Sequence, residues 1–194
     1  MRLFKFDNYD HYVRVQTACN KLKLDVIWLG KREAQVLIET VKRLVPSATF
    51  GICHGVRNGT EVRYLREALN INVIGTEISD TAERFENVIQ WDFHDVKLEW
   101  LRKVDFIYSN SFDHSHNPGA AISSWMSCLS EQGVCIIHWS TGHDYPEFAY
   151  DGADCFQAPK SDYLKLFEPY ELVEVVEIGD DEKQCLIVIR NRRV

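Results

Sequence analysis

Two glycines and a glutamate occur at a spacing that suits the binding of a nucleoside. Gly55 and Gly59 follow a short apolar run, and an amphipathic stretch and a second apolar run then lead to Glu77. This order predicts a βαβ unit with a glycine loop at the carboxyl end of its first strand. Such a loop lets a ligand approach the backbone, and an acid that ends the second strand can accept a hydrogen bond from a ribose hydroxyl.

Histidines provide side chains that could move a proton or ligate a metal. His114 and His116 come just after one predicted strand, and His138 and His143 lie at the end of another. Neither pair has a strong metal-ligand spacing, so we expect no metal. For His114 the alternative to a chemical role is a loop contact or a cap on the following helix.

Two further histidines and the cysteines are expected to be structural. We expect His54 to pack in the core or satisfy a loop, and His94 to face solvent. The six cysteines form no CxxC motif, and most lie in apolar runs, where a free thiol behaves as a small hydrophobe. This pattern predicts reduced thiols rather than disulfides or a zinc site.

The composition is that of an ordinary soluble domain. The chain has 194 residues, of which 45% are hydrophobic and 26% charged, and its net charge is -7. The charge is spread along the chain, so we expect no nucleic-acid partner. Nothing resembles a signal peptide or a membrane-spanning helix, so we expect no membrane association and a cytoplasmic protein.

The elements that must position these residues follow from hydrophobic periodicity. Apolar residues recur at helical spacing over 31–45. Asn117 and Pro118 are typical of a helix start, and Asp80 with Glu83 resembles a capping box. Short apolar runs predict strands at 50–54, 72–78, 88–93, 104–111 and 134–139, and a hairpin at 171–178 and 184–190.

Five alternating β and α units followed by a hairpin predict the fold class. Alternation is typical of a parallel sheet covered on both faces. We therefore expect an α/β three-layer sandwich with a mostly parallel seven-stranded sheet, closed by an antiparallel C-terminal hairpin. The ligand site of such a sheet lies at the carboxyl ends of its strands.

The stretch from Ser140 to Ser161 is different. It has no periodicity, so its aromatic residues are not expected to form a core element; they are Tyr145, Phe148, Tyr150 and Phe156. A long loop in a compact domain is usually a lid or a binding loop. We therefore expect this stretch to lie over the ligand site.

The segment from Asp105 to His114 is the most specific motif, and reads Asp-Phe-Ile-Tyr-Ser-Asn-Ser-Phe-Asp-His. Together with the glycine loop, Glu77 and Asp92, it resembles the class I, Rossmann-like S-adenosylmethionine-dependent methyltransferases. The resemblance covers residues 49–139, and the closing hairpin also matches that family.

The resemblance implies S-adenosyl-L-methionine as the cofactor. Gly55 and Gly59 would frame the loop under its methionine part, and Glu77 would accept both ribose hydroxyls. The other implied contacts are Ile78 and Phe93 on the adenine ring, Asp92 at the adenine amino group, and Asn110 near the sulfonium and the amine. The chain would then divide into an N-terminal helical cap, a cofactor-binding core, a lid loop and a closing helix with hairpin, at 1–48, 49–140, 141–160 and 161–194.

The glycine loop departs from the pattern of that family at two positions. The family has acid-x-Gly-x-Gly-x-Gly, whereas Cys53 stands here in place of the acid and Arg57 in place of the middle glycine. The guanidinium of Arg57 could pair with the carboxylate of the cofactor, or its side chain could crowd the loop.

The leading hypothesis for function is a methyltransferase acting on oxygen or nitrogen of a small polar acceptor, such as a sugar or an amine. Methyl transfer requires donor and acceptor to be held in line, and a base helps where the acceptor carries a proton. The candidate bases are His114, His138, His143 and Asp113. The chain has no separate substrate domain, which leaves room for a partner, including a second copy of itself.

Two other hypotheses belong to different classes. One is a non-catalytic subunit or scaffold that keeps this fold, for which Cys53 and Arg57 are the favouring features. The other is a nicotinamide-dependent dehydrogenase, which Glu77 would suit. The spacing from Gly55 to Gly59 lacks the dinucleotide pattern, so the dehydrogenase ranks last.

Overall fold

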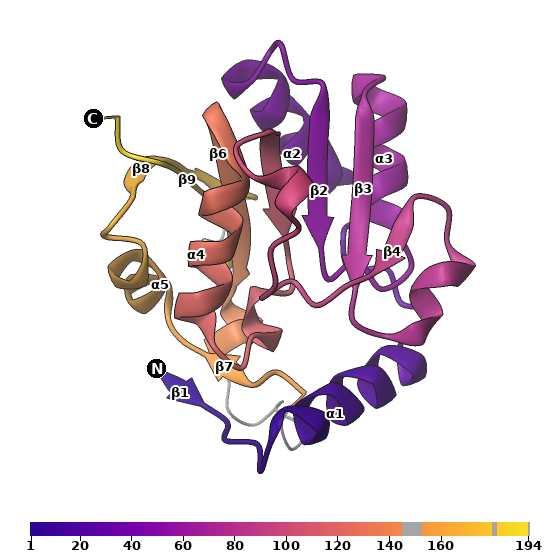
Figure 1. Cartoon of the computed structure of the whole chain (residues 1–194). Coiled ribbons are helices and arrows are strands. Elements are labelled where there is room, and N and C mark those ends of the chain that lie inside the picture. Colours follow the sequence, from indigo (N-terminus) through magenta and orange to yellow (C-terminus); the bar gives the residue numbers. More distant parts are fainter. Residues whose placement is uncertain (145–152, 180–181, 194) are drawn as a thin grey trace.

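The structure is a computed structural model that describes residues 1–144, 153–179 and 182–193. The strands of its main sheet are β2 (Phe50–His54), β3 (Asn72–Glu77), β4 (Val88–Gln90), β5 (Val104–Ser109), β6 (Leu129–Ser140), β8 (Glu171–Glu177) and β9 (Gln184–Arg190). The sheet has the order β4-β3-β2-β5-β6-β9-β8 (Figure 1). The first five are parallel, and β9 is antiparallel to β6 and β8. The predicted fold class is therefore confirmed.

Helices cover both faces of this sheet. They are α2 (Lys31–Leu44), α3 (Thr60–Leu69), α4 (Pro118–Cys128) and α5 (Lys160–Leu166). Successive side chains of a strand point to opposite faces, so each buried strand contributes to two apolar layers. Phe106 and Tyr108 pack with α2 and α3, whereas Ile107 lies in the layer formed with α4 and α5.

A further helix, α1 (Tyr9–Leu22), lies across the carboxyl ends of β2 and β3 instead of on a sheet face (Figure 1). Its N-terminal side is held by a small antiparallel sheet of β1 (Arg2–Leu3) and β7 (Phe156–Gln157). Its C-terminal side contacts the 3-10 helix η1 (Asp80–Arg84), where Asn20 accepts a hydrogen bond of 2.9 Å from the hydroxyl of Thr81. α1 is therefore placed to cover the predicted ligand site.

Several expected boundaries and caps differ in the structure. β4 ends at Gln90, so Asp92 and Phe93 lie in the loop that follows the strand. η1 is capped by Ser79, whose hydroxyl accepts from the amide of Thr81, so the expected capping box at Asp80 is wrong. β6 begins at Leu129, earlier than the expected start at residue 134, and Gly133 lies within the strand. A Cβ at Gly133 would meet the carbonyl oxygen of Val104 at 2.7 Å, which explains the glycine there.

The expected lid over 140–161 is described only in part. Residues 145–152 lie outside the described residues, including three of the four aromatic side chains. The 3-10 helix η4 (Thr141–Asp144) precedes them. Phe156 is fully buried beside Phe112 and Tyr163, so the expectation that it stands outside the core is wrong. The role of this stretch as a lid stays a prediction.

Within the described ranges, we find no helix both long and apolar enough to cross a membrane.

The remaining short 3-10 helices of these ranges lie in connections between strands and helices. They are η2 (Leu98–Trp100) and η3 (Phe112–His114).

Candidate functional site

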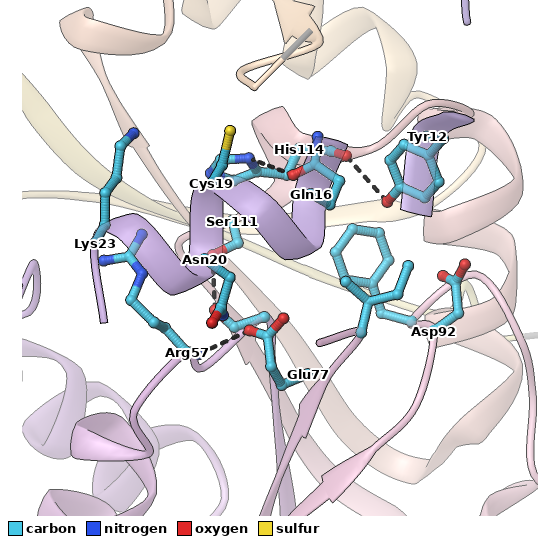
Figure 2. A pocket seen from close by; sticks show the side chains of 13 residues that line it. Tyr12, Gln16, Cys19, Asn20, Lys23, Arg57, Glu77, Asp92, Ser111 and His114 are labelled. Atoms are coloured by element: carbon cyan, nitrogen blue, oxygen red, sulfur yellow. Dashed lines mark hydrogen bonds between the residues drawn. The ribbon is translucent and has the colours of Figure 1, made fainter. Parts of the chain in front are cut away.

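Two adjoining cavities lie at the carboxyl ends of the parallel strands. The smaller cavity has a volume of about 50 Å³ and lies between α1 and the ends of β2, β3 and β4 (Figure 2). The larger cavity has a volume of about 460 Å³ and extends toward the ends of β5 and β6. The two share Lys23, Gly55, Arg57, Ser111 and His114. A long ligand could therefore pass over Gly55 from one cavity into the other.

The smaller cavity brings together most of the predicted cofactor residues. Its floor is formed by Gly55, Arg57, Glu77, Ile78, Asp92 and Phe93. Its roof is a face of α1, formed by Tyr12, Gln16, Cys19, Asn20 and Lys23. Sequence reasoning missed the roof. The helical spacing of these five positions is visible in the sequence, but it does not indicate what the face covers.

The glycine loop has the shape that a close ligand needs. Gly55 has φ +71, and a Cβ there would lie 2.5 Å from Cβ of Ser111. Arg57 is also left-handed, with φ 46, which is rare for a residue with a side chain. This conformation accompanies a hydrogen bond of 2.9 Å from its amide to Oε2 of Glu77. The loop and the end of β3 are thus tied together.

Gly59 lies at the end of the glycine loop, where α3 begins. It is the N-cap of α3 with φ +70, and a Cβ there would lie 2.9 Å from Val88. Among the described residues that line the two cavities, Gly59 does not occur. It shapes the turn into α3, and its role in framing the loop under the cofactor stays a prediction.

Glu77 is buried at the floor of the smaller cavity. Its Oε2 accepts from Arg57, and its Oε1 accepts from the amide of Ser79 at 3.1 Å. Burial raises the pKa of this carboxyl, although the two backbone amides act in the opposite direction. An ionised carboxylate has about four acceptor positions, so two remain for further donors.

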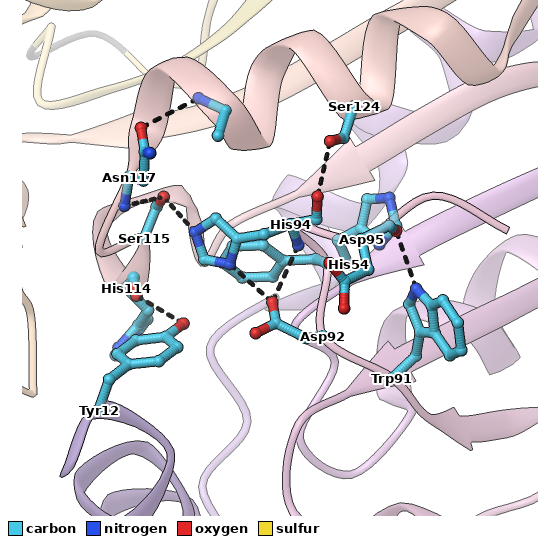
Figure 3. Close-up of polar contacts among 12 residues, drawn as sticks. Tyr12, His54, Trp91, Asp92, His94, Asp95, His114, Ser115, Asn117 and Ser124 are labelled. Carbon is cyan, nitrogen blue, oxygen red and sulfur yellow. Dashed lines mark hydrogen bonds and ion pairs between the residues drawn. The ribbon is translucent and has the colours of Figure 1, made fainter. Parts of the chain in front are cut away.

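Asp92 is the centre of a polar cluster beside the cavity (Figure 3). Its Oδ1 lies 2.6 Å from Nδ1 of His94, and its Oδ2 accepts from the hydroxyl of Tyr9 at 2.7 Å. Nε2 of His94 lies 2.8 Å from the hydroxyl of Ser115. Burial raises the pKa of Asp92, but the hydrogen bonds from His94 outweigh it and bring the pKa below its usual value.

The prediction that His94 faces solvent is therefore wrong. Its side chain is only 8% exposed, and Asp92 and Ser115 bind its two ring nitrogens. The expectation for His54 is confirmed: it is buried, stacks on Trp125, and lies 2.8 Å from the hydroxyl of Thr76.

His114 lies on the wall shared by the two cavities. Its Nδ1 is 2.7 Å from the carbonyl oxygen of Ala153 and 3.1 Å from Oε1 of Gln16. Both partners are acceptors, so Nδ1 carries the proton in the neutral ring. Nε2 then holds the lone pair, 3.7 Å from Oδ1 of Asp154. Gln16 of α1 and the carbonyl oxygen of Ala153 thus fix the tautomer of His114.

His138 and Asn110 line the larger cavity only. Nε2 of His138 lies 3.1 Å from Oε1 of Gln184, and Nδ1 lies 3.1 Å from the hydroxyl of Tyr108. Because Nε2 must donate to Gln184, the lone pair on Nδ1 is occupied by the tyrosine. Asn110 donates to Oε1 of Glu61 at 3.4 Å. The backbone of His143 lies in η4, and its side chain is outside what the structure describes.

The possible metal ligands that lie close together in the structure are not the histidine pairs noted in the sequence. Within the described ranges, the groups with ligand atoms inside 4.8 Å of one another are Asp92 with His94 and His116, and Asp113 with His114 and Asp154. Both nitrogens of His94 already have partners, and so does Nδ1 of His114.

Comparison with known proteins identifies the fold. The sequence matches no protein-family model and no curated protein. Among solved structures, the 1,6-didemethyltoxoflavin N1-methyltransferase of Burkholderia thailandensis, with bound S-adenosylhomocysteine, is similar with a TM-score of 0.76 and 10% identity, over 97% of this chain and 92% of that one. The chain has the Rossmann-like fold of the class I S-adenosylmethionine-dependent methyltransferases.

Other methyltransferases share this fold. A sugar N-methyltransferase from Streptoalloteichus is similar with a TM-score of 0.64 and 17% identity, over 84% of this chain and 88% of that one. A TehB-like S-adenosylmethionine-dependent methyltransferase of Corynebacterium glutamicum has a TM-score of 0.62 and 15% identity, over 95% and 100%. The spread of these relatives supports the fold and leaves the acceptor open.

The structure also explains the departures of this methyltransferase fold in its glycine loop. Cys53 is fully buried below the loop, and burial raises the pKa of its thiol well above the usual value, so it offers no anion to a ligand. The side chain of Arg57 leaves the loop, and its Nη1 lies 3.3 Å from the carbonyl oxygen of Val26. It lies beside Lys23 at one end of the smaller cavity, with Asp92 at the other (Figure 2).

Proposed function

We propose that this protein is an S-adenosylmethionine-dependent methyltransferase that acts on oxygen or nitrogen of a small polar acceptor. The observation that carries the proposal is the position of Glu77. It ends β3 directly beside the loop at Gly55, and its carboxylate keeps acceptor positions toward a cavity after binding two backbone amides. Two ribose hydroxyls suit these positions.

The two cavities suit the two ends of the cofactor. Ile78, Asp92 and Phe93 would hold the adenine in the smaller cavity, and the methionine part would pass over Gly55 toward Arg57 and Asn110 in the larger one. The smaller cavity, at about 50 Å³, is well below the ~300 to 1,000 Å³ of ligand pockets. We therefore expect α1 to shift when the adenosine binds.

The acceptor would occupy the rest of the larger cavity. Its volume of about 460 Å³ suits a small molecule, and its lining includes the polar side chains of Asp113, His114, His138 and Asp154. Bound S-adenosylmethionine supplies an electrophilic methyl group on a sulfonium. The walls hold the nucleophilic atom of the acceptor in line with it, and Nε2 of His114 accepts the proton that the acceptor loses. His138 is the weaker candidate base, because Tyr108 occupies its lone pair.

The remaining parts of the proposal follow from the same site. Residues 141–160 would form a lid over the acceptor, within the division into cap, core, lid and closing hairpin given above. We expect a small-molecule acceptor and a cytoplasmic protein, and we expect neither nucleic acid nor membrane as a partner.

The test is the affinity for S-adenosylhomocysteine, measured by isothermal titration calorimetry. Glu77→Ala should weaken binding by roughly 2 to 4 kcal/mol, as expected for charged hydrogen bonds. Glu67→Ala is a matched control, because Glu67 is exposed on α3. Circular dichroism should show that both variants keep the fold. An unchanged dissociation constant in Glu77→Ala, or no binding by the wild type, would contradict the proposal.

A further inference from the structure

Glu61 is a buried carboxyl without an evident structural purpose. It lies in the first turn of α3, only 7% exposed, and lines the larger cavity. Its Oε1 accepts a long hydrogen bond from Asn110 at 3.4 Å. Its Oε2 is buried and has no hydrogen-bond partner among the described residues. Burying a carboxyl oxygen that lacks a hydrogen-bond partner costs folding free energy, so we expect Glu61 to have a function.

The surroundings of Glu61 indicate the charge of the missing partner. Burial raises the pKa of Glu61 to about 7, against the opposing effects of its own backbone amide, Arg57 and Asn110. A cation at the cavity wall would satisfy the carboxyl and favour its ionised form. Rotation about the last side-chain torsion exchanges the two oxygens, so either can meet a ligand.

The amino-acid end of the cofactor has the matching charges. It carries an ammonium and a carboxylate, and on the proposed function it enters the larger cavity past Gly55 and Arg57. The guanidinium of Arg57 suits the carboxylate. Cys53 stands where the fold usually has an acid, and its buried thiol cannot replace one. Glu61, two residues after Gly59, is the buried acid on this side of the loop.

We propose that Glu61 binds the ammonium group of the methionine part of the cofactor, and so replaces the acid that is missing at Cys53. This inference rests on the proposed function. Glu61 and Arg57 then form a complementary pair. Glu61, in the first turn of α3, binds the ammonium, and Arg57, in the loop after β2, binds the carboxylate.

The experiment compares four ligands by calorimetry on the full chain. They are S-adenosylhomocysteine, its analogue without the amino group, its analogue without the carboxylate, and 5′-methylthioadenosine, which lacks both. Glu61→Gln should weaken binding of the two ligands with an amino group by roughly 10- to 100-fold, as for a charged hydrogen bond. It should leave the affinity for the other two unchanged. Glu67→Gln, on the exposed side of the same helix, is the matched control.

Each other outcome has one meaning. Equal loss for all four ligands would show that Glu61 only supports the loop, and no loss for any would show that it does not contact the ligand; either result overturns the inference. If the wild type binds 5′-methylthioadenosine but shows no preference for the amino group, the inference fails and the proposed function stands. If the wild type binds none of the four, the proposed function itself fails.

The pH dependence of ligand affinity provides a second readout. A purely structural role of Glu61 would not affect it. In the empty protein Glu61 must lose a proton before it can bind an ammonium, and its pKa is about 7. Affinity for S-adenosylhomocysteine should therefore rise between pH 6 and pH 8 in the wild type, relative to the analogue without the amino group. This relative rise should be absent in Glu61→Gln.

Discussion

The hydroxyl of Tyr9, on α1, donates a hydrogen bond of 2.7 Å to Oδ2 of Asp92, in the loop after β4. The contact joins residues 83 positions apart and ties α1 to Asp92, which lines the smaller cavity at the end that would hold adenine. Burial and the Asp92 carboxylate raise the pKa of Tyr9, so its hydroxyl stays a donor over the physiological range. In this structure α1 is therefore tied to a residue that the proposed cofactor would use.

Removing this contact should speed binding of the cofactor. We expect Tyr9→Phe to raise the association rate of S-adenosylhomocysteine by roughly two- to fivefold, a modest effect because Tyr9 is 52% exposed. Stopped-flow tryptophan fluorescence measures the rate, and Tyr64→Phe on α3 is the control. Slower or weaker binding would instead make Tyr9 part of the adenine site.

His114 should be required for the chemical step and not for cofactor binding. His114→Ala should lower the turnover rate by roughly 100- to 10,000-fold. Calorimetry should show unchanged affinity for S-adenosylhomocysteine. His138→Gln should lower turnover much less, since the lone pair of His138 is already bonded to Tyr108. If the two variants exchange these results, the base is His138.

Gln16 should act by positioning His114. Its Oε1 accepts from Nδ1 of His114, and its Nε2 donates to the carbonyl oxygen of Ala153 at 3.0 Å, so its amide orientation is fixed. Gln16→Leu should lower turnover by roughly 10-fold, less than His114→Ala, because Ala153 still holds Nδ1. In a double mutant, little further loss beyond His114→Ala is expected. Additive losses would mean that Gln16 acts on the ligand directly.

The buried carboxyl of Glu61 should make stability depend on pH. Its pKa is about 7 in the folded protein and is near 4.5 when exposed. Because the folded state holds the proton more tightly, the contribution of Glu61 is full below pH 4.5 and is lost as pH rises through 7. Between pH 5 and 7.5, urea unfolding should show Glu61→Gln gaining roughly 2 to 3 kcal/mol relative to the wild type. Glu67→Gln should show no such gain. If the free energy of unfolding of Glu61→Gln changes with pH in the same way as that of the wild type, the assignment is contradicted.

The local parts of the site could be predicted from the sequence. The strand ending at His54, the glycine turn and Glu77 are encoded by neighbouring residues, because strand and helix periodicity and glycine conformation are short-range properties. Parallel strands then bring their carboxyl ends to one edge, so Glu77, Asn110 and His138 were placed there correctly from strand order alone.

The contacts that decide the chemistry came only with the tertiary structure. The roof of α1 over the smaller cavity joins Gln16 to His114 across 98 positions, and this contact, together with the one to Ala153, fixes which nitrogen of His114 carries the proton. The burial of Glu61 and the engagement of His94 likewise depend on which elements meet at the sheet edge. Burial, tautomer and pKa are set by atoms distant in sequence, so the sequence determined where the site lies, and packing decided what its side chains can do there.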